Sequence, residues 1–147
     1  MSMVDISGKD VVYREAVAEG VIRLKPETIK RILEGRVEKG DVFTVSRVAA
    51  IAAVKRTPDL LPLCHNIPIT HVGVEFRVIG DDRILARVSV KTTARTGVEM
   101  EALVGVSVAL LNIWDMVKKY EKDGSGQYLD TFIEYVRVVY KRKGGIE

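Results

Sequence analysis

The segment from Thr96 to about Lys122 constrains the fold of this chain more than any other. Its residues predict one long helix, which Asp123-Gly-Ser-Gly126 ends. Between Ala102 and Val117 the apolar residues fall on every side of that helix, so it must be covered all round. One sheet face cannot do this in a chain of 147 residues. We therefore expect this helix, or the open face of a sheet, to lie in a subunit interface.

The other predicted elements form a sheet on which this helix can pack. We expect a strand from Val11 to Leu24 with a bulge at Gly20, a short helix from Pro26 to Gly35, a helix from Asp41 to about Lys55, and strands at Ile69–Val78, Ile84–Thr93 and Phe132–Lys141. Without the short helix the order is βαββαβ, which is the ferredoxin-like pattern. The sequence thus predicts an α+β fold, with an antiparallel sheet and helices on one face.

Composition favours a soluble protein with a small anionic ligand. A content of 47% apolar and 29% charged residues fits one globular domain over residues 1–147. The one cysteine cannot form an internal disulfide, we see no signal peptide, and the apolar run is too short for a membrane span. We therefore expect a cytoplasmic protein with no membrane partner. The net charge of +3 is spread over small clusters, which argues against a nucleic-acid partner.

Three of the four prolines lie between Thr57 and Pro68, together with Cys64 and His65. Prolines restrict the backbone of the residues before them, so we expect a stiff loop. Adjacent side chains in an extended loop point to opposite sides, so Cys64 and His65 do not form a dyad. We expect Cys64 to pack as a small buried apolar residue. His65 is left open between a ligand contact and a structural hydrogen bond.

The chain has few histidine and cysteine side chains that could bind a metal ion. His71, the second histidine, starts a predicted strand and is expected to be ordinary. Two histidines and one cysteine fall short of the roughly four ligands that a zinc site uses. We therefore expect no metal centre.

Two glutamates, Glu99 and Glu101, open the long helix. Thr96-Gly-Val-Glu99 fits a capping box, in which the threonine and the glutamate satisfy N–H groups at the helix start. Glu101 lies about 200° further round the helix, so it is not needed for capping and is freer to meet a substrate. The helix dipole favours both carboxylates, so neither alone indicates function.

Asp115 interrupts the apolar turn from Ile113 to Val117, with Lys118 and Lys119 one turn further on. A plain surface ion pair would contribute about 0.3–0.5 kcal/mol. The apolar surroundings instead favour a partly buried, functional pair. A lysine held in this way would titrate nearer neutrality and serve as an acid or a base.

Basic residues elsewhere could hold phosphate groups. Lys39-Gly40-Asp41 precedes a predicted helix, where an anion site and a solvated turn fit equally well. Lys91, Arg95 and Lys141 are each weak indications on their own.

The spacing of Glu101 and Asp115 limits how they can cooperate. They are 14 residues apart on the predicted helix, which corresponds to about 21 Å at the helical rise. A ligand the size of a nucleotide can hardly bridge that distance within one subunit. If both residues serve one site, the site draws on two subunits.

Taken together and in order, several motifs resemble one known family. They are Lys39-Gly-Asp-Val-Phe43, Lys55-Arg-Thr57, Asp59-Leu-Leu-Pro-Leu-Cys-His65, Thr96-Gly-Val-Glu-Met-Glu-Ala-Leu103 and Asp115-Met-x-Lys118. The chain resembles the molybdenum cofactor biosynthesis protein C family, the cyclic pyranopterin monophosphate synthases, over nearly its whole length. The resemblance implies a lyase that converts a cyclised dihydro-GTP to cyclic pyranopterin monophosphate and releases pyrophosphate. It implies no organic cofactor, and nothing in the sequence indicates magnesium.

The resemblance also implies roles for particular residues. The catalytic group would be Asp115, Lys118 and Lys39, and the substrate contacts would be Leu63, Cys64, His65, Met100, Glu101, Glu99 and Lys141. The end of the chain, Lys141-Arg-Lys-Gly-Gly-Ile-Glu147, departs from the usual ending of bacterial members. Lys141 matches the phosphate-contacting lysine there, with Lys143 as the alternative.

The resemblance implies a homohexamer built from dimers, with each site at a subunit interface. The main alternative is a non-catalytic, nucleotide-binding regulatory module on the same fold. Asp115 within an apolar helix speaks against it, because simple binding rarely needs that feature. RNA binding through an open sheet is disfavoured, because the strands lack stacking aromatic residues.

Overall fold

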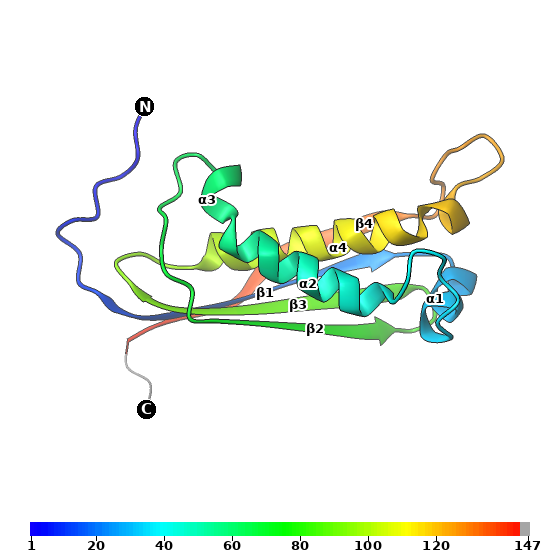
Figure 1. Ribbon diagram of the computed structural model, residues 1–147, viewed down its shortest axis with the longest axis horizontal. Coiled ribbons are helices and arrows are strands. Elements are labelled where there is room, and N and C mark those ends of the chain that lie inside the picture. The colour runs from blue at the N-terminus through cyan, green and yellow to red at the C-terminus, as the bar shows by residue number, and fades with distance from the viewer. Residues whose placement is uncertain (145–147) are drawn as a thin grey trace.

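In the computed structural model, which describes residues 1–144, helices cover one face of a four-stranded antiparallel sheet (Figure 1). The elements are β1 (Val12–Arg23), α1 (Pro26–Leu33), α2 (Val42–Lys55), α3 (Thr57–Leu60), β2 (His71–Ile79), β3 (Arg83–Ala94), α4 (Glu99–Glu121) and β4 (Phe132–Lys143). The strands lie in the order β2-β3-β1-β4. The predicted ferredoxin-like α+β arrangement is confirmed, with α1 as the predicted extra short helix and α3 as a second one.

Local chemistry accounts for most of the element boundaries. Pro26 occupies the first turn of α1, where its missing N–H costs nothing. Asp41 caps α2 by accepting a hydrogen bond from the Thr44 N–H at 2.9 Å. Gly80 takes a positive φ of 61° in the turn between β2 and β3. These boundaries agree with the predicted ones.

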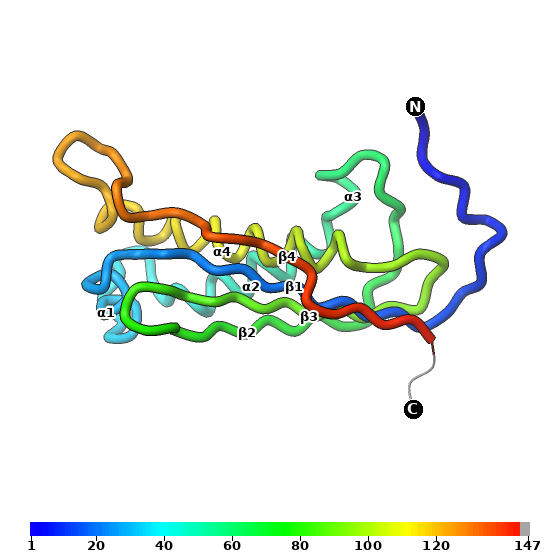
Figure 2. The backbone as a smooth tube through the Cα atoms, turned by 180° about the vertical axis from the view of Figure 1, so that it is seen from behind, coloured from blue at the N-terminus to red at the C-terminus, as the bar shows by residue number. Residues whose placement is uncertain are grey.

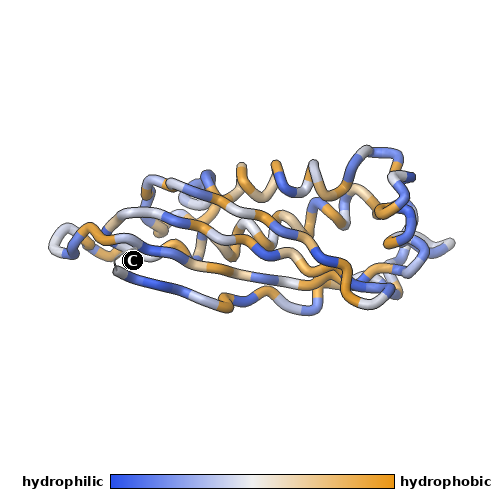
Figure 3. The backbone as a smooth tube through the Cα atoms, turned by 90° about the horizontal axis from the view of Figure 1, so that it is seen from below, coloured by the Kyte–Doolittle hydropathy of each residue, from blue (hydrophilic) through white to orange (hydrophobic). Residues whose placement is uncertain are grey.

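The two faces of the sheet differ sharply in chemistry. Residues at alternate positions of β1 and β3, such as Ala18 and its neighbour Val88, are buried beneath the helices. The opposite face is largely polar: Glu19 accepts hydrogen bonds from Arg87 at 3.2 Å and from the Tyr135 hydroxyl at 2.8 Å. Figure 3 shows hydrophilic and hydrophobic residues alternating along the strands. An antiparallel sheet with one covered and one polar face is therefore formed.

Helix α4 is the centre of the core and also reaches the surface. Ala102, Leu110 and Val117 are fully buried, whereas Met100 and Leu111 are exposed. In the described part of the chain α4 is the one helix with the length and hydropathy of a membrane span. Half of its apolar stretch is buried inside the protein. Its apolar character therefore fits a core helix. The predicted subunit interface on its exposed side stays a prediction.

Two segments flank the sheet at opposite ends of the molecule (Figure 2). The residues between α4 and β4 loop out at one end. The first ten residues, here called the N-terminal arm, extend at the other end beside the segment that follows α3. The predicted loop from Thr57 to Pro68 is partly wrong, because its start forms α3. Pro58 stands in the first turn of α3, where proline is compatible with a helix.

Two glycines allow α4 to pack closely. A Cβ on Gly105 of α4 would lie 2.7 Å from Val54 Cγ2 of α2 and 3.1 Å from Val88 Cγ1 of β3. A Cβ on Gly20 of β1 would lie 2.7 Å from the Tyr135 carbonyl oxygen and 2.8 Å from Leu110 Cδ1. The register shifts between β1 and β4 occur on both sides of Gly20, close to the predicted bulge.

We expect Gly20→Ala to lower the free energy of unfolding by about 1–3 kcal/mol, because the added methyl group overpacks the contact between α4 and the sheet. Urea denaturation monitored by circular dichroism measures this change. Gly124→Ala is the matched control, since a Cβ there meets nothing within 4 Å. Equal stability of the two variants would contradict the packing role of Gly20.

Candidate active site

At the C-terminal end of α4, two lysines converge on one carboxylate. Lys39 Nζ donates to Asp115 Oδ2 and to the Asp115 carbonyl oxygen, both at 3.0 Å. Lys118 Nζ lies 3.0 Å from Asp115 Oδ1. Lys39 comes from the segment between α1 and α2, far away in sequence. The structure thus brings together the three residues for which the family resemblance implies a catalytic role.

The turn that presents Lys39 is fastened to α4 by its neighbours. The Glu38 backbone N–H donates to the Tyr120 hydroxyl at 3.0 Å, and the Glu38 carboxylate forms an ion pair with Lys119. Gly40 closes the turn with a φ of 120°, a conformation that favours glycine. Lys39 is therefore directed to Asp115 rather than to the start of α2, where Asp41 provides the cap.

The electrostatics of this cluster correct the sequence-based expectation. Asp115 is not partly buried: its side chain is 55% exposed, because Ile113, Met116 and Val117 take the inward positions of that turn. Hydrogen bonds from Lys39 and Lys118 lower the pKa of Asp115. The hydrogen bond to Asp115 and its charge raise the pKa of Lys118, so the lysine does not titrate nearer neutrality in the protomer. Asp115 therefore holds Lys118 in its charged, protonated form in the protomer.

The opposite end of α4 holds a buried acidic group. Glu101 is 2% exposed, and its Oε2 accepts a hydrogen bond from the Cys64 thiol at 3.9 Å. Its Oε1 is buried and has no hydrogen-bond partner in the described protein. Burial, reinforced by the charge of Glu99, raises the pKa of Glu101. Burial, followed by the Glu101 charge, likewise raises the pKa of the Cys64 thiol, which disfavours a nucleophilic thiolate.

The expectation for Cys64 needs correction. Cys64 is half-buried and directed at a carboxylate, so it is not simply an apolar packing residue. Glu101 is enclosed, and one of its oxygens has no partner in the described protein. A buried carboxylate oxygen without a partner costs stability unless a ligand or a second chain supplies a donor.

Glu99 does not form the predicted capping box. The cap of α4 is Val98, and no side chain caps the helix. A Cβ at Gly97 would collide with the Glu99 carboxylate, so the glycine makes room for that side chain. Glu99 Oε1 lies 3.5 Å from Lys141 Nζ, and Oε2 is buried without a partner. The chain ending that differs from the usual ending of bacterial members includes residues 145–147, which lie outside the described residues.

The charged state of Glu101 should weaken the fold. When the pKa of a carboxyl is higher in the folded than in the unfolded protein, the free energy of unfolding falls as pH rises from the unfolded pKa through the folded pKa. The raised pKa of Glu101 therefore makes the protein less stable at neutral pH than in acid, where the carboxyl is protonated in the folded and the unfolded protein. We expect Glu101→Gln to raise the free energy of unfolding by about 1–3 kcal/mol near neutral pH, and by much less in acid, where the carboxyl is already protonated.

Urea denaturation across a pH series measures this difference. Glu27→Gln is the control, because Glu27 is exposed in the first turn of α1. A loss of stability in Glu101→Gln at neutral pH would show that the charged carboxylate is satisfied by a donor, in contradiction to the expectation.

His65 and its neighbours border a cavity of about 650 Å³ between the N-terminal arm and the segment that follows α3. His65 Nε2 lies 2.7 Å from the Val4 carbonyl oxygen. Thr93 and Arg95 line the same cavity from the end of β3. Sequence reasoning missed the arm as part of this region, since nothing in its short polar sequence indicates where it lies.

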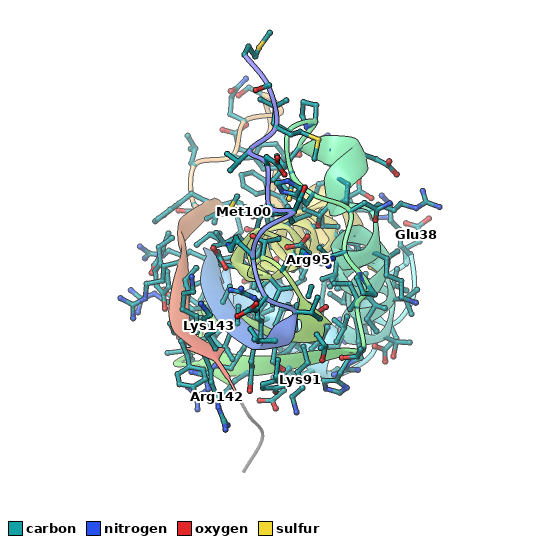
Figure 4. The ribbon with its side chains drawn as sticks, turned by 90° about the vertical axis from the view of Figure 1, so that its left-hand side faces the viewer. Glu38, Lys91, Arg95, Met100, Arg142 and Lys143 are labelled. Atoms are coloured by element: carbon teal, nitrogen blue, oxygen red, sulfur yellow. The ribbon has the colours of Figure 1, made fainter. Side chains whose placement is uncertain are left out.

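Two further predicted contacts, Leu63 and Met100, are exposed. Figure 4 looks onto this end of the molecule, with Met100 and Arg95 labelled beside the N-terminal arm. Leu63, Cys64 and His65 follow one another shortly after the end of α3, and Met100 lies between the two glutamates of α4. The predicted substrate-contact residues therefore gather near the N-terminal end of α4.

The predicted site residues thus form two groups, one at each end of the unbroken helix α4. Asp115 and Glu101 are 14 residues apart in α4, or about 21 Å along its axis. One protomer does not bring these groups together. Over residues 1–144, no group of three or more His, Cys, Asp or Glu side chains is placed to hold a metal ion.

Comparison with known proteins identifies relatives over nearly the full chain. The model of the MoaC family matches residues 3–144. A probable cyclic pyranopterin monophosphate synthase of Methanococcoides burtonii is 60% identical over 141 residues, covering 96% of this chain and 88% of its own length. One of Aeropyrum pernix is 62% identical over 142 residues, covering 97% of each chain.

A third relative has a different description. The protein of Methanothermobacter thermautotrophicus is 56% identical over 141 residues, covering 96% of this chain and 88% of its own length. It is described as a probable cyclic pyranopterin monophosphate synthase accessory protein.

Proposed function

The chain belongs to the MoaC family, and we propose on that premise that it is a cyclic pyranopterin monophosphate synthase of molybdenum or tungsten cofactor biosynthesis. Its substrate is a cyclised dihydro-GTP, and its products are cyclic pyranopterin monophosphate and pyrophosphate. The structural observation that supports this function most strongly is the convergence of Lys39 and Lys118 on Asp115. Simple nucleotide binding does not need two lysines fixed on one carboxylate.

The chemistry assigns a task to each member of this cluster. The reaction rearranges a ring and forms a cyclic phosphate by intramolecular attack of a hydroxyl on phosphorus, while pyrophosphate leaves. Both steps move protons, which positioned side chains accelerate. Lys118, held charged by Asp115, donates a proton, and Lys39 is the second acid/base group. Asp115 orients both ammonium groups.

The residues at the other end of α4 hold the substrate. Glu101 Oε1 offers a buried acceptor for an N–H group of the purine-derived rings. His65 lies against the cavity, and Leu63, Cys64 and Met100 complete the contacts. Lys141, beside Glu99, meets the phosphates. Donors on the substrate would then satisfy the buried carboxylate oxygen.

We place the complete site between two copies of the chain. The distance along α4 prevents one protomer from bringing both groups to one substrate, whereas a second copy can supply the missing half. Exposed Met100 and Leu111 on α4 and Val48 on α2 provide apolar surface for such a contact. A homohexamer arranged as three dimers, in the cytoplasm, is the assembly we propose.

Turnover by the purified protein alone tests the function. Incubation with the cyclised dihydro-GTP should release pyrophosphate and form the pterin product, in parallel arms with magnesium and with a chelator. A synthase that is known to work serves as the positive control. Absence of turnover in both arms, with the control active, would favour a regulatory nucleotide-binding module or an accessory role like that of the Methanothermobacter relative.

A further inference from the structure

The N-terminal arm meets the rest of the protein at His65. Most of residues 1–10 are exposed and only Ile6 is half-buried. Asp5 Oδ1 accepts hydrogen bonds from the Ser7 backbone N–H at 2.9 Å and from the Ser7 hydroxyl, and the Lys9 N–H donates to the Ile6 carbonyl at 3.0 Å. These bonds shape the arm internally. Among residues 1–144, the hydrogen bond that joins the arm to the body is that between Val4 and His65.

The partner of His65 determines which ring nitrogen has a proton. A backbone carbonyl oxygen accepts hydrogen bonds and cannot donate one. At 2.7 Å from the Val4 oxygen, Nε2 must therefore be the donor. In a neutral imidazole one nitrogen is protonated and the other has a free lone pair. Nδ1 of neutral His65 is consequently a hydrogen-bond acceptor.

The cavity beside this ring is large enough for part of a nucleotide. Its volume of about 650 Å³ falls in the range of about 300–1,000 Å³ that is typical of small-molecule sites. Asp5 from the arm and Arg95 from the end of β3 give it charges of both signs. Figure 4 shows Arg95 beside the arm at this end of the molecule. The arm is therefore a wall of the cavity as well as the partner of His65.

We propose that the Val4 carbonyl is a positioning group, which holds His65 with Nε2 protonated so that Nδ1 accepts a hydrogen bond from an N–H or O–H of the substrate. The role assigned to the substrate rests on the proposed function. The state of the ring does not, because it follows from a contact within the protein. The N-terminal arm thereby belongs to the substrate site, although it lies outside the family motifs.

The state of the ring can be measured without turnover. NMR shifts of the ring nitrogens in labelled, full-length protein distinguish the two neutral tautomers. The chain has two histidines, so a His71→Gln variant assigns the signals of His65. We expect protonated Nε2 and unprotonated Nδ1 at a pH at which the ring is neutral. A protonated Nδ1, or rapid averaging between tautomers, would overturn the proposal.

Two substitutions separate positioning of the ring from contact with the substrate. The amide of His65→Gln can occupy the place of Nε2 and keep a donor for Val4, but it has no acceptor in place of Nδ1. The amide of His65→Asn can occupy the place of Nδ1 and lose the Val4 contact. We expect His65→Gln to lower kcat/KM about tenfold or more, as for loss of one hydrogen bond to the substrate, and His65→Asn to lose less.

The reverse order, with His65→Gln the more active, would mean that His65 serves only to hold the arm and would refute the substrate contact. Thermal unfolding of both variants checks that each is folded. If the intact protein shows no synthase activity, the proposed function fails while the NMR result still decides the tautomer. The two failures are therefore distinguishable.

Discussion

Lys118→Ala is expected to reduce kcat by about 10²–10⁴-fold, the contribution that a positioned acid or base makes to proton transfer. The lysine lies 3.0 Å from Asp115 Oδ1, and its exposed position in the protomer means that its removal leaves no cavity in the core. Pyrophosphate release under saturating substrate measures the loss. Stability should change little, so unfolding curves separate a chemical effect from a folding effect.

Lys119→Ala is the matched control. Lys119 is the next residue on α4, it is also exposed, and its partner is Glu38 rather than Asp115. The Glu38 N–H still donates to the Tyr120 hydroxyl in this variant, so the turn that presents Lys39 stays fastened to α4. We expect its activity to remain within a few-fold of that of the parent protein. Unchanged activity in Lys118→Ala would defeat the role assigned to this lysine even if the enzyme itself is active.

The pH dependence of Asp115→Asn provides a sharper test of the same cluster. Asp115 raises the pKa of Lys118 through a hydrogen bond and its charge. Asparagine removes the charge, so the pKa of Lys118 falls and the charged acid is lost at lower pH. The alkaline limb of the kcat profile should therefore move to lower pH. A limb that stays in place would assign the proton donor to another group.

Glu121→Ala is expected to cause the largest loss of stability, about 3–5 kcal/mol, because it leaves several buried donors unsatisfied and opens a cavity. Glu121, in the last turn of α4, is fully buried. Its carboxylate accepts hydrogen bonds from the Lys25 N–H at 3.2 Å, from the Thr131 hydroxyl at 2.6 Å and from the Thr28 hydroxyl. It thus ties the start of α1 and the approach to β4 to one point of α4.

Glu121→Gln distinguishes hydrogen bonding from mere filling of space. Glutamine has nearly the same volume and keeps one acceptor oxygen, and the threonine hydroxyls can rotate toward its amide. We expect it to lose clearly less stability than alanine in urea denaturation. A loss below about 1 kcal/mol in Glu121→Ala, the scale of a single ordinary hydrogen bond, would show that the three contacts do not act together.

The order of elements could be predicted because local signals mark their ends. Pro26, Asp41 and Gly80 each fix a boundary through a property of one residue, and the structure agrees at all three. The prediction for the start of α4 was wrong, because the glutamate of a possible capping box can also turn away from the helix N–H groups. The Glu99 side chain folds over Gly97 instead of meeting the helix N–H groups.

The sequence predicted which residues belong to the candidate site, but not all of their contacts or their burial. Sequence spacing placed Lys118 next to Asp115, yet the contact with Lys39 depends on how a distant turn packs on α4. The prediction that Asp115 is partly buried was wrong, because the sequence of an apolar turn does not reveal which of its positions faces outward. Similarly, no local pattern places Val4 against His65, since the fold of the whole chain sets that contact.

The close packing of α4 at Gly105 restricts which substitutions this sequence can accumulate during evolution. The helix is unbroken, so a displacement at its middle is transmitted to the lysine cluster at one end and to the buried glutamate at the other. Val54 and Val88, which border Gly105, therefore restrict chemistry that they never touch. Substitutions at these three positions should become tolerable in combination, with a larger residue on one side matched by a smaller one opposite.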